Sequence, residues 1–278
     1  MSVANNLERA VNSLRLAILA LSLALAIPAV ADDAPFLGTD PASVPAKGEI
    51  DLQQWVNAGY GSTGQSYSGV ESLSELDYAL SDRIQLAVTL AYDWSRTRSS
   101  GEPAGTTSLI GVQGELIYVV APVDNSPVGV AFAIDPSFGP NSRGFDFRIL
   151  LTKYVAHFEN VLNINFENAW DKDPSGHWQG SGAIGFNYGL AHALNKHWTI
   201  GIEFGNELSF NQLLTATDFK DTSTTMFLGP TVEYDCEAVV VTFGVQTQLP
   251  LASGANVVNG YTAGTERWRA GLRFVRAI

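Results

Sequence analysis

Residues 84–94 read IQLAVTLAYDW, and this stretch decides the fold. Its large apolar residues stand at every second position from Ile84 to Trp94, with small or polar residues between them. Because successive side chains of a β-strand point to opposite faces, this period of two predicts a strand with one apolar face and one polar face. The stretch also has about the 9–11 residues that a tilted strand needs to cross a bilayer.

The same period recurs along almost the whole chain after Gly48. Short connections alternate with longer polar ones, as in an antiparallel meander whose two ends lie on the same side. An open sheet edge would leave backbone N–H and C=O groups unpaired in hydrocarbon, so the sheet must close. We therefore expect an all-β fold, a closed antiparallel transmembrane β-barrel with short periplasmic turns and longer extracellular loops. The pattern predicts twelve strands: Ile50–Tyr60, Leu73–Leu80, Ile84–Trp94, Ile110–Val120, Val128–Ile134, Phe145–Leu151, Leu162–Trp170, Ile184–Leu190, Trp198–Phe204, Met226–Tyr234, Val239–Thr247 and Trp268–Ile278.

The composition of the chain agrees with a membrane location. Of 278 residues, 46% are hydrophobic and only 16% are charged, against roughly 25% charged in an average soluble protein. A soluble β-sandwich, the competing architecture, would carry more Lys, Glu and Arg on its solvent faces. The net charge of -12 argues against nucleic acid as a partner, because phosphate binding needs a basic surface. The single cysteine, Cys236, excludes a disulfide framework and a cysteine-rich zinc site.

The N-terminal residues 1–31 have the features of a cleaved signal peptide. Arg9 and Arg15 precede an apolar run over residues 16–27, which is too short to span a bilayer. Pro28 then precedes Ala29-Val30-Ala31, a small-x-small cleavage signal. Residues 32–48 hold three prolines and little apolar pattern, so we expect a flexible periplasmic lead-in before a barrel over residues 49–278. This organisation predicts export to the cell outer membrane.

Aromatic residues gather at the ends of the predicted strands. A bilayer favours Tyr and Trp at headgroup depth on both sides, so two girdles of such residues are typical of a transmembrane barrel. Packing at strand ends would be the simpler explanation. The candidates are Tyr78, Tyr118, Trp198 and Tyr234 near the short turns and Tyr60, Trp94, Trp170 and Trp268 near the long loops.

The polar faces of the strands are expected to line an acidic lumen. Carboxylates and only three arginines share these faces. An acid-lined water path would favour cations over anions; alternatively, the side chains form a hydrogen-bonded interior that holds the barrel rigid. We expect Arg148 to pair with Glu115 or Glu167, and Arg269 and Arg273 to reach the acids of the first two strands. The candidates are Asp51, Glu75, Asp77, Asp93, Glu115, Asp146, Glu167, Glu203, Glu207 and Glu233, with Arg148, Arg269 and Arg273.

Passage of small molecules or ions is the function that these features favour. One rival is an outer-membrane enzyme at the loop rim, for which His177 with Asp171, Asp173 and Ser175 forms the best cluster. The other rival is a structural or adhesive barrel with a closed lumen. The long loop over residues 250–266 is a candidate constriction if it folds inward. The sequence indicates no cofactor, no metal site and no catalytic residue.

A family resemblance supports the same interpretation. Leu76 to Leu86, through the turn Ser81-Asp82-Arg83, resembles a hairpin of Gram-negative outer-membrane barrels. These are the uncharacterised transporter-like barrels grouped with the phenol-degradation (meta-pathway) proteins. Residues 49–55 resemble their first strand, and Gly271 with Phe274 resembles the C-terminal signal read by the barrel assembly machinery, although the chain ends in Ile278. The resemblance implies outer-membrane lipid and that machinery as partners, and small-molecule passage as a role.

Overall fold

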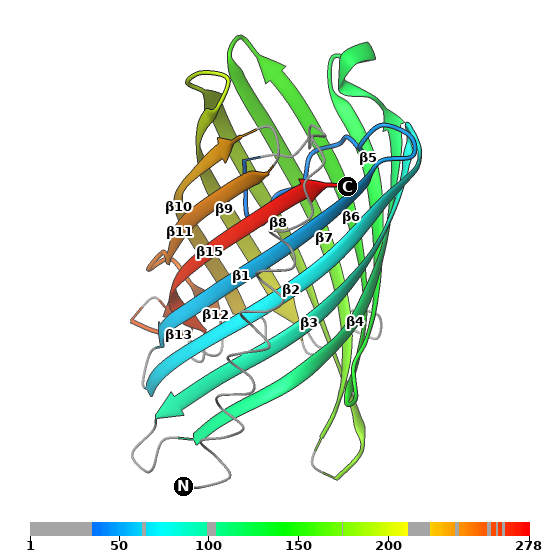
Figure 1. Cartoon of the computed structure of the whole chain (residues 1–278). Helices are drawn as coiled ribbons and strands as arrows, with labels where there is room; N and C mark the ends of the chain where they lie inside the picture. The colour runs from blue at the N-terminus through cyan, green and yellow to red at the C-terminus, as the bar shows by residue number, and fades with distance from the viewer. Residues whose placement is uncertain are drawn as a thin grey trace, which may run out of the picture.

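The fold is a closed β-barrel of twelve long antiparallel strands in the part of the chain described by the computed structural model (Figure 1). That part comprises residues 35–62, 65–98, 104–173, 175–210, 223–236, 239–254, 257–259, 261–262 and 265–278. The expected signal peptide, residues 1–31, lies outside it. The strands are β1 (Ile50–Ser62), β2 (Gln65–Ser81), β3 (Ile84–Arg98), β4 (Ala104–Ala121), β5 (Gly129–Phe138), β6 (Ser142–Val155), β7 (Phe158–Lys172), β8 (Trp178–Ala193), β9 (Trp198–Phe210), β10 (Ser223–Asp235), β11 (Val240–Gln248) and β15 (Glu266–Ala277).

The first and last strands close the barrel. β1 pairs with β2 on one side and with β15 on the other, while β11 joins β15 to β10. The register places Asp51 opposite both Asp77 of β2 and Ala277 of β15. This confirms the predicted closed antiparallel barrel and the expected pairing of the final strand with the first.

Minor elements complete the chain. A 3-10 turn, η1 (Val123–Asn125), lies in the connection between β4 and β5. Three two-residue strands, β12 (Ser253–Gly254), β13 (Val257–Val258) and β14 (Tyr261–Thr262), lie in the long connection before β15. β12 pairs with β10, and β13 pairs with β14. Within the described residues, no helix has the length and apolar character needed to cross a membrane.

Most strands extend further toward the long-loop end than the sequence predicted. β2 begins at Gln65 rather than Leu73, and β4 begins at Ala104 rather than Ile110. The apolar period detects only the part of a strand with a lipid-facing side, whereas backbone pairing between adjacent strands continues beyond the hydrocarbon. Asp135 illustrates the effect, because it lies just beyond the predicted strand Val128–Ile134 and yet belongs to β5.

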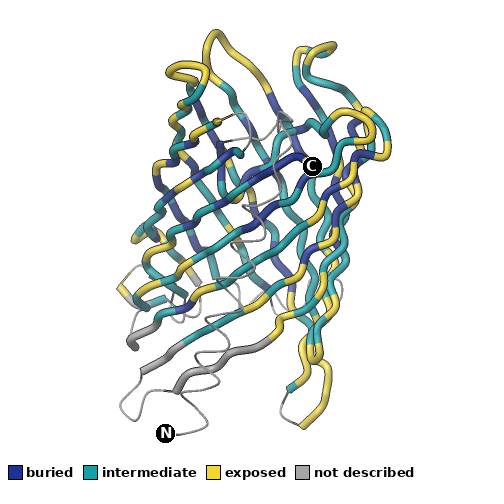
Figure 2. The backbone as a smooth tube through the Cα atoms, in the orientation of Figure 1, coloured by how far each residue is buried: buried dark blue, intermediate teal, exposed yellow. Residues whose placement is uncertain are grey.

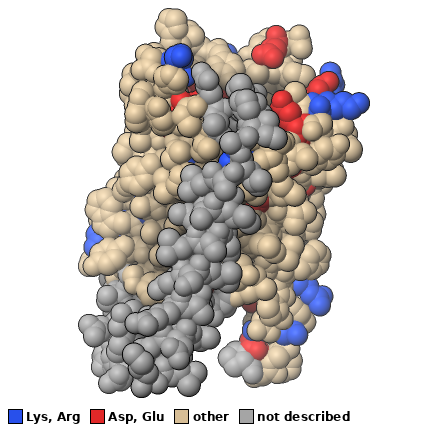
Figure 3. Space-filling model, viewed as in Figure 1, with Lys and Arg blue, Asp and Glu red and all other residues tan. Residues whose placement is uncertain are grey.

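Exposed and buried residues alternate along the strands, as Figure 2 shows. On β3, Val88 is 55% exposed whereas its neighbours Ala87 and Thr89 are buried. On the face shown in Figure 3, charged side chains gather near the two ends of the barrel, and the band between them is mostly uncharged. An apolar outer band with charge at its margins is the surface that a bilayer accommodates.

The predicted girdle aromatics lie toward the strand ends. Tyr60 of β1 is paired with Trp268 of β15 near the long loops, and the rings of Trp198 and Tyr234 lie 4.7 Å apart near the short turns. Exposed fractions range from 38% for Tyr234 to 66% for Tyr60 among the seven that are exposed, and Trp94 is half-buried. Those seven are Tyr60, Tyr78, Tyr118, Trp170, Trp198, Tyr234 and Trp268.

Residues 36–47 run inside the barrel, and we call them the lumenal strap. The strap begins beside β8 and β9, crosses to β5 and β6, and leaves at the short-turn end, where the Lys47 N–H donates to Asp82 (3.0 Å) before β1 begins (Figure 1). The sequence predicted a flexible periplasmic lead-in here. The structure places these residues in the lumen, because inward-facing polar side chains bind the backbone of the strap.

Candidate functional site

The lumen is the candidate site, and Glu203 of β9 holds the strap within it. The Gly38 N–H and the Thr39 hydroxyl both donate to Oε1 of Glu203, each at 2.7 Å, and the Leu37 N–H donates to Oε2 at 3.3 Å. Gln246 of β11 donates to the same Oε2 at 2.8 Å. A buried carboxylate needs such donors, since an unpaired charge is costly in a low-dielectric interior. Glu203 therefore anchors the strap to the barrel wall.

Two apolar side chains of the strap fit against glycines of the wall. Phe36 is fully buried, and a Cβ on Gly189 would stand 2.6 Å from its ring. The Leu37 side chain occupies the space beside Gly244 and Gly271 in the same manner. Glycine at these positions leaves room for the strap, because any side chain would meet it.

Arg148 of β6 is the centre of an ion-pair network. Its guanidinium binds Asp135 of β5 at 2.7 Å, together with Glu115 of β4 and Asp40 of the strap. Three carboxylates thus surround one guanidinium group, whose planar set of N–H donors suits carboxylate oxygens. The pairing with Glu115 matches the sequence expectation, whereas no ion pair joins Arg148 to Glu167 among the described residues. The network ties the strap to the β4–β6 wall.

Further bonds hold the middle of the strap. The Asn163 amide of β7, oriented to satisfy both groups, accepts from the Asp40 N–H (2.7 Å) and donates to the Asp40 carbonyl (2.8 Å). The Ala42 N–H donates to the Thr152 hydroxyl at 2.7 Å. Ala42 also packs with apolar residues of β4–β6, which include Leu150. The strap is therefore bound along most of its length and divides the lumen.

Three cavities border the strap, with volumes of about 320, 400 and 440 Å³, here called the first, second and third cavity. Gly38 lines all three. Asn165, Glu167 and Asn187 line both the first and the third. The strap residue Gly38 thus lies where the three cavities meet. Strands β7 and β8 supply a wall that the first and third cavities share.

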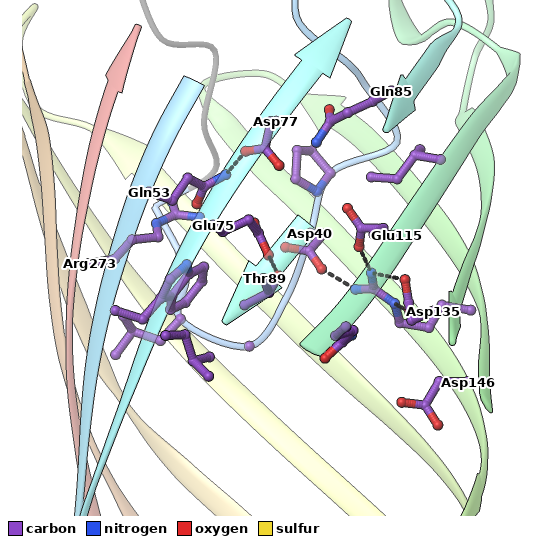
Figure 4. A pocket seen from close by; sticks show the side chains of 18 of the residues that line it. Asp40, Gln53, Glu75, Asp77, Gln85, Thr89, Glu115, Asp135, Asp146 and Arg273 are labelled. Atoms are coloured by element: carbon purple, nitrogen blue, oxygen red, sulfur yellow. Dashed lines mark hydrogen bonds and ion pairs between the residues drawn. The ribbon is translucent and has the colours of Figure 1, made fainter. Parts of the chain in front are cut away.

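The carboxylates predicted from sequence are distributed among these cavities. Figure 4 shows the first cavity, where Asp40 of the strap lies between Glu75 on one side and Glu115 with Asp135 on the other. Eight of the thirteen candidates line the first cavity: Asp51, Glu75, Asp77, Glu115, Asp146, Glu167, Arg148 and Arg273. Asp93 and Arg269 line the second, and Glu203, Glu207, Glu167 and Arg269 line the third. Glu233 is buried apart from them and accepts a hydrogen bond from Thr242 at 3.3 Å.

The two arginines of the last strand, expected to reach the acids of the first two strands, both lie over aromatic rings. Arg269 binds Glu266 three residues before it, and its guanidinium lies 3.7 Å from the ring centre of Phe227. Arg273 lies over the Trp55 ring at 4.9 Å from its centre. Stacking on aromatic rings stabilises both cations.

The sequence missed two acids of the Arg148 network. Asp135 continues the inward series of Ala131 and Ala133, so extending the period of two by one step would have found it. Asp40 had no comparable signal, because its partners are remote in sequence: Arg148 lies 108 residues away. Local patterns carry no information about such a contact.

The connection between β11 and β15 reaches the lumen. Thr262 is buried, and its hydroxyl lies 2.9 Å from the hydroxyl of Thr225 on the inner face of β10. Thr262 and Thr265 line the third cavity. The loop over residues 250–266 thus contributes polar groups to the wall at the long-loop end.

The His177 cluster has the geometry of a turn. Asp173 Oδ1 accepts from the backbone N–H groups of His177 (2.9 Å) and Ser175 (2.8 Å), and Asp173 Oδ2 accepts from the Gln179 amide (3.2 Å). The His177 side chain is 81% exposed, with Nδ1 at 3.8 Å from Asp173. The acid therefore bonds to groups of its own loop.

These bonds predict a pH effect on the turn. The His177 N–H, followed by the Gln179 amide and the Ser175 N–H, lowers the pKa of Asp173 below its ordinary value of 3.8. A lowered folded-state pKa stabilises the turn above the ordinary value, and this stabilisation is lost as the pH falls through the lowered pKa. We expect protection factors for the Ser175 and His177 amides to fall in acid, measured by hydrogen exchange. The isosteric variant Asp173→Asn should lose this pH dependence, and unchanged wild-type protection well below pH 3.8 would contradict it.

No cluster of three or more His, Cys, Asp or Glu side chains in the described part of the chain has the arrangement of a metal site. The lumenal acids come from separate strands and face several cavities rather than one point.

Comparisons with known proteins agree with the fold. A model of DUF6662, a family of unknown function, matches residues 28–270, and comparison with curated protein sequences gives no match. The structure is similar to the COG4313 outer membrane channel from Pseudomonas putida F1, with a TM-score of 0.64 and 13% identity over 87% of this chain and 100% of that chain. It is similar to the β domain of the Bordetella autotransporter BrkA, with a TM-score of 0.50 and 10% identity over 84% and 100% of the two chains.

A third solved structure, the NanC porin, covers 81% of this chain and 97% of its own, with a TM-score of 0.48 and 9% identity. At these identities, the first two similarities establish the fold of an outer-membrane barrel. The narrower resemblance to the phenol-degradation group is not confirmed by them.

Proposed function

This chain belongs to the DUF6662 family, and we propose that it is an outer-membrane channel through which small solutes and ions pass, with a preference for cations. The observation that carries the proposal is the shared lining of the cavities. Gly38 borders all three, and carboxylates line each of them. Acidic rings and walls attract cations and repel anions in narrow pores.

The charge balance of the first cavity supports a cation preference. Eight carboxyl groups line it, namely those of Asp40, Asp51, Glu75, Asp77, Glu115, Asp135, Asp146 and Glu167. Among the described residues that line it, only Arg148 and Arg273 carry opposing guanidinium groups. Several acids also lie directly opposite one another on neighbouring strands, as Asp135, Asp146 and Glu167 do across β5, β6 and β7. Like charges in such positions repel, so a passing cation would be stabilised there.

A barrel with a closed lumen is the second candidate. The strap favours it, because bonds from Glu203, Arg148 and Asn163 hold that segment across the lumen. The channel is preferred because cavities remain on both sides of the strap. Conductance distinguishes the two functions.

The test is electrical recording of the purified full-length barrel in a planar bilayer. Under a KCl gradient we expect small, steady currents with a reversal potential that indicates K⁺ over Cl⁻. Neutralising Glu167 and Glu207 together, as Glu167→Gln with Glu207→Gln, should reduce that preference without abolishing the current. Anion selectivity would overturn the cation preference, and absence of conductance in folded protein would favour the closed structural barrel.

A further inference from the structure

The first cavity contains acceptors without donors, and these indicate a ligand. Gln53 of β1 is 8% exposed, and its Nε2 donates to Asp77 at 2.6 Å, which fixes the amide. Its Oε1 is buried and has no hydrogen-bond partner within the described part of the protein. Asn165 of β7 likewise has a buried Oδ1 without a partner there. Both residues line the first cavity. Leaving buried acceptors unsatisfied is costly, so such atoms need an explanation.

Two carboxylates lie beside Asn165 on the lumenal face. Asp146 of β6 lies directly opposite Glu167 of β7, and Glu167 follows Asn165 by two residues on the same inward face. Neither acid forms an ion pair with another described residue. Repulsion between opposed acids is relieved by a cation that contacts both. The unpartnered oxygen of Asn165 would accept an N–H from the same group.

The strap supplies a further acid between the two walls. Asp40 lies in the cavity between Glu75 and the β4–β6 wall, and Arg148 is bound to it (Figure 4). A guanidinium group is therefore already accommodated here by carboxylates of this cavity. Because Asp40 belongs to the strap, the cavity keeps this lining only while the strap stays in place.

We propose that the first cavity is a binding site for a small organic cation with ammonium or guanidinium groups, held by Asp146, Asn165 and Glu167 on one wall and by Gln53 on the other. The proposal rests on the channel function and assigns its substrate class. The N–H groups of such a cation can donate to these acceptors, which lie on separate strands. The volume of about 320 Å³ lies at the small end of the range for ligand pockets, roughly 300–1,000 Å³, which suits a diamine or a similar compound.

The test is equilibrium binding of agmatine, which carries one ammonium and one guanidinium group, to the purified full-length barrel by titration calorimetry. We expect saturable binding, no binding of the neutral 1,4-butanediol, and affinity for agmatine reduced about tenfold by Glu167→Gln, because a charge-assisted hydrogen bond is lost. Gln53→Leu should also weaken binding. The matched control is Asp171→Asn, an isosteric loss of one charge on the same strand at the exposed loop end.

Folding of each variant is checked by its heat-dependent electrophoretic mobility. Absence of saturable agmatine binding, or equal weakening by Glu167→Gln and Asp171→Asn, would overturn the site. Saturable binding of Mg²⁺ that excludes agmatine would overturn it in favour of a metal site. Cation-selective conductance without agmatine binding refutes this site alone, whereas agmatine binding without conductance refutes only the channel.

Discussion

Exchanging residues 36–39 for a Gly–Ser sequence is expected to raise the single-channel conductance several-fold. The exchange removes the side chains of Phe36 and Leu37, and with them the apolar contacts that secure this end of the strap to the wall. A Gly–Ser segment behaves as a flexible coil, so we expect it to leave Glu203 even though its backbone N–H groups remain able to donate. Since Gly38 lies where the three cavities meet, releasing this segment merges them into a wider path.

A substitution in the barrel wall should release the strap in the same way. In Gly189→Leu, the new side chain occupies the place of the Phe36 ring, because even a Cβ there would stand 2.6 Å from that ring. We expect this substitution to displace the strap and to increase the current in the same direction. Lys47→Ala, at the exposed end of the strap, serves as the control and should leave the conductance unchanged. Wild-type conductance in both the Gly–Ser exchange and Gly189→Leu would show that solutes pass without contacting the strap.

The sequence predicts the wall of this barrel far better than its contents. Each strand carries its own evidence, as residues 84–94 do, because alternation is a local property that a bilayer enforces on every strand. The pairing of β15 with β1 then follows from the need to close the sheet. The twelve strands, and the face on which each side chain lies, can therefore be predicted without knowing which residues distant in sequence are in contact.

The strap could not be predicted in this way. Its residues have no periodic pattern, and the three prolines of residues 32–48 predicted a flexible lead-in. Its stability comes from partners such as Glu203, which lies 165 residues from Gly38 in sequence. Glycines of β8, β9, β11 and β15 face the strap, but inward-facing glycines would fit any narrow barrel and do not by themselves predict a strap. Only the closed barrel brings these groups together.

Replacing Arg148 by Met is expected to cause the largest loss of stability among single substitutions in the lumen. Arg148 is 17% exposed, and its partners Glu115 and Asp135 are 13% and 2% exposed, so removal of the guanidinium leaves partly buried carboxylates facing one another. Breaking a buried ion pair by deleting one partner costs about 3–5 kcal/mol. Reversible urea unfolding of the barrel in lipid measures the free energy of unfolding directly.

The control for this prediction is Arg269→Met, which removes an arginine that is 45% exposed and bound to Glu266. Pairs this exposed contribute about 0–1 kcal/mol, so the two substitutions should differ clearly. Arg148→Lys keeps the charge but loses the fork that binds two oxygens of Asp135, and it should fall between wild type and Arg148→Met. The loss in Arg148→Met should also shrink in acid, because protonated carboxyl groups no longer repel one another. Equal losses for Arg148→Met and Arg269→Met at neutral pH would show that the network does not stabilise the barrel.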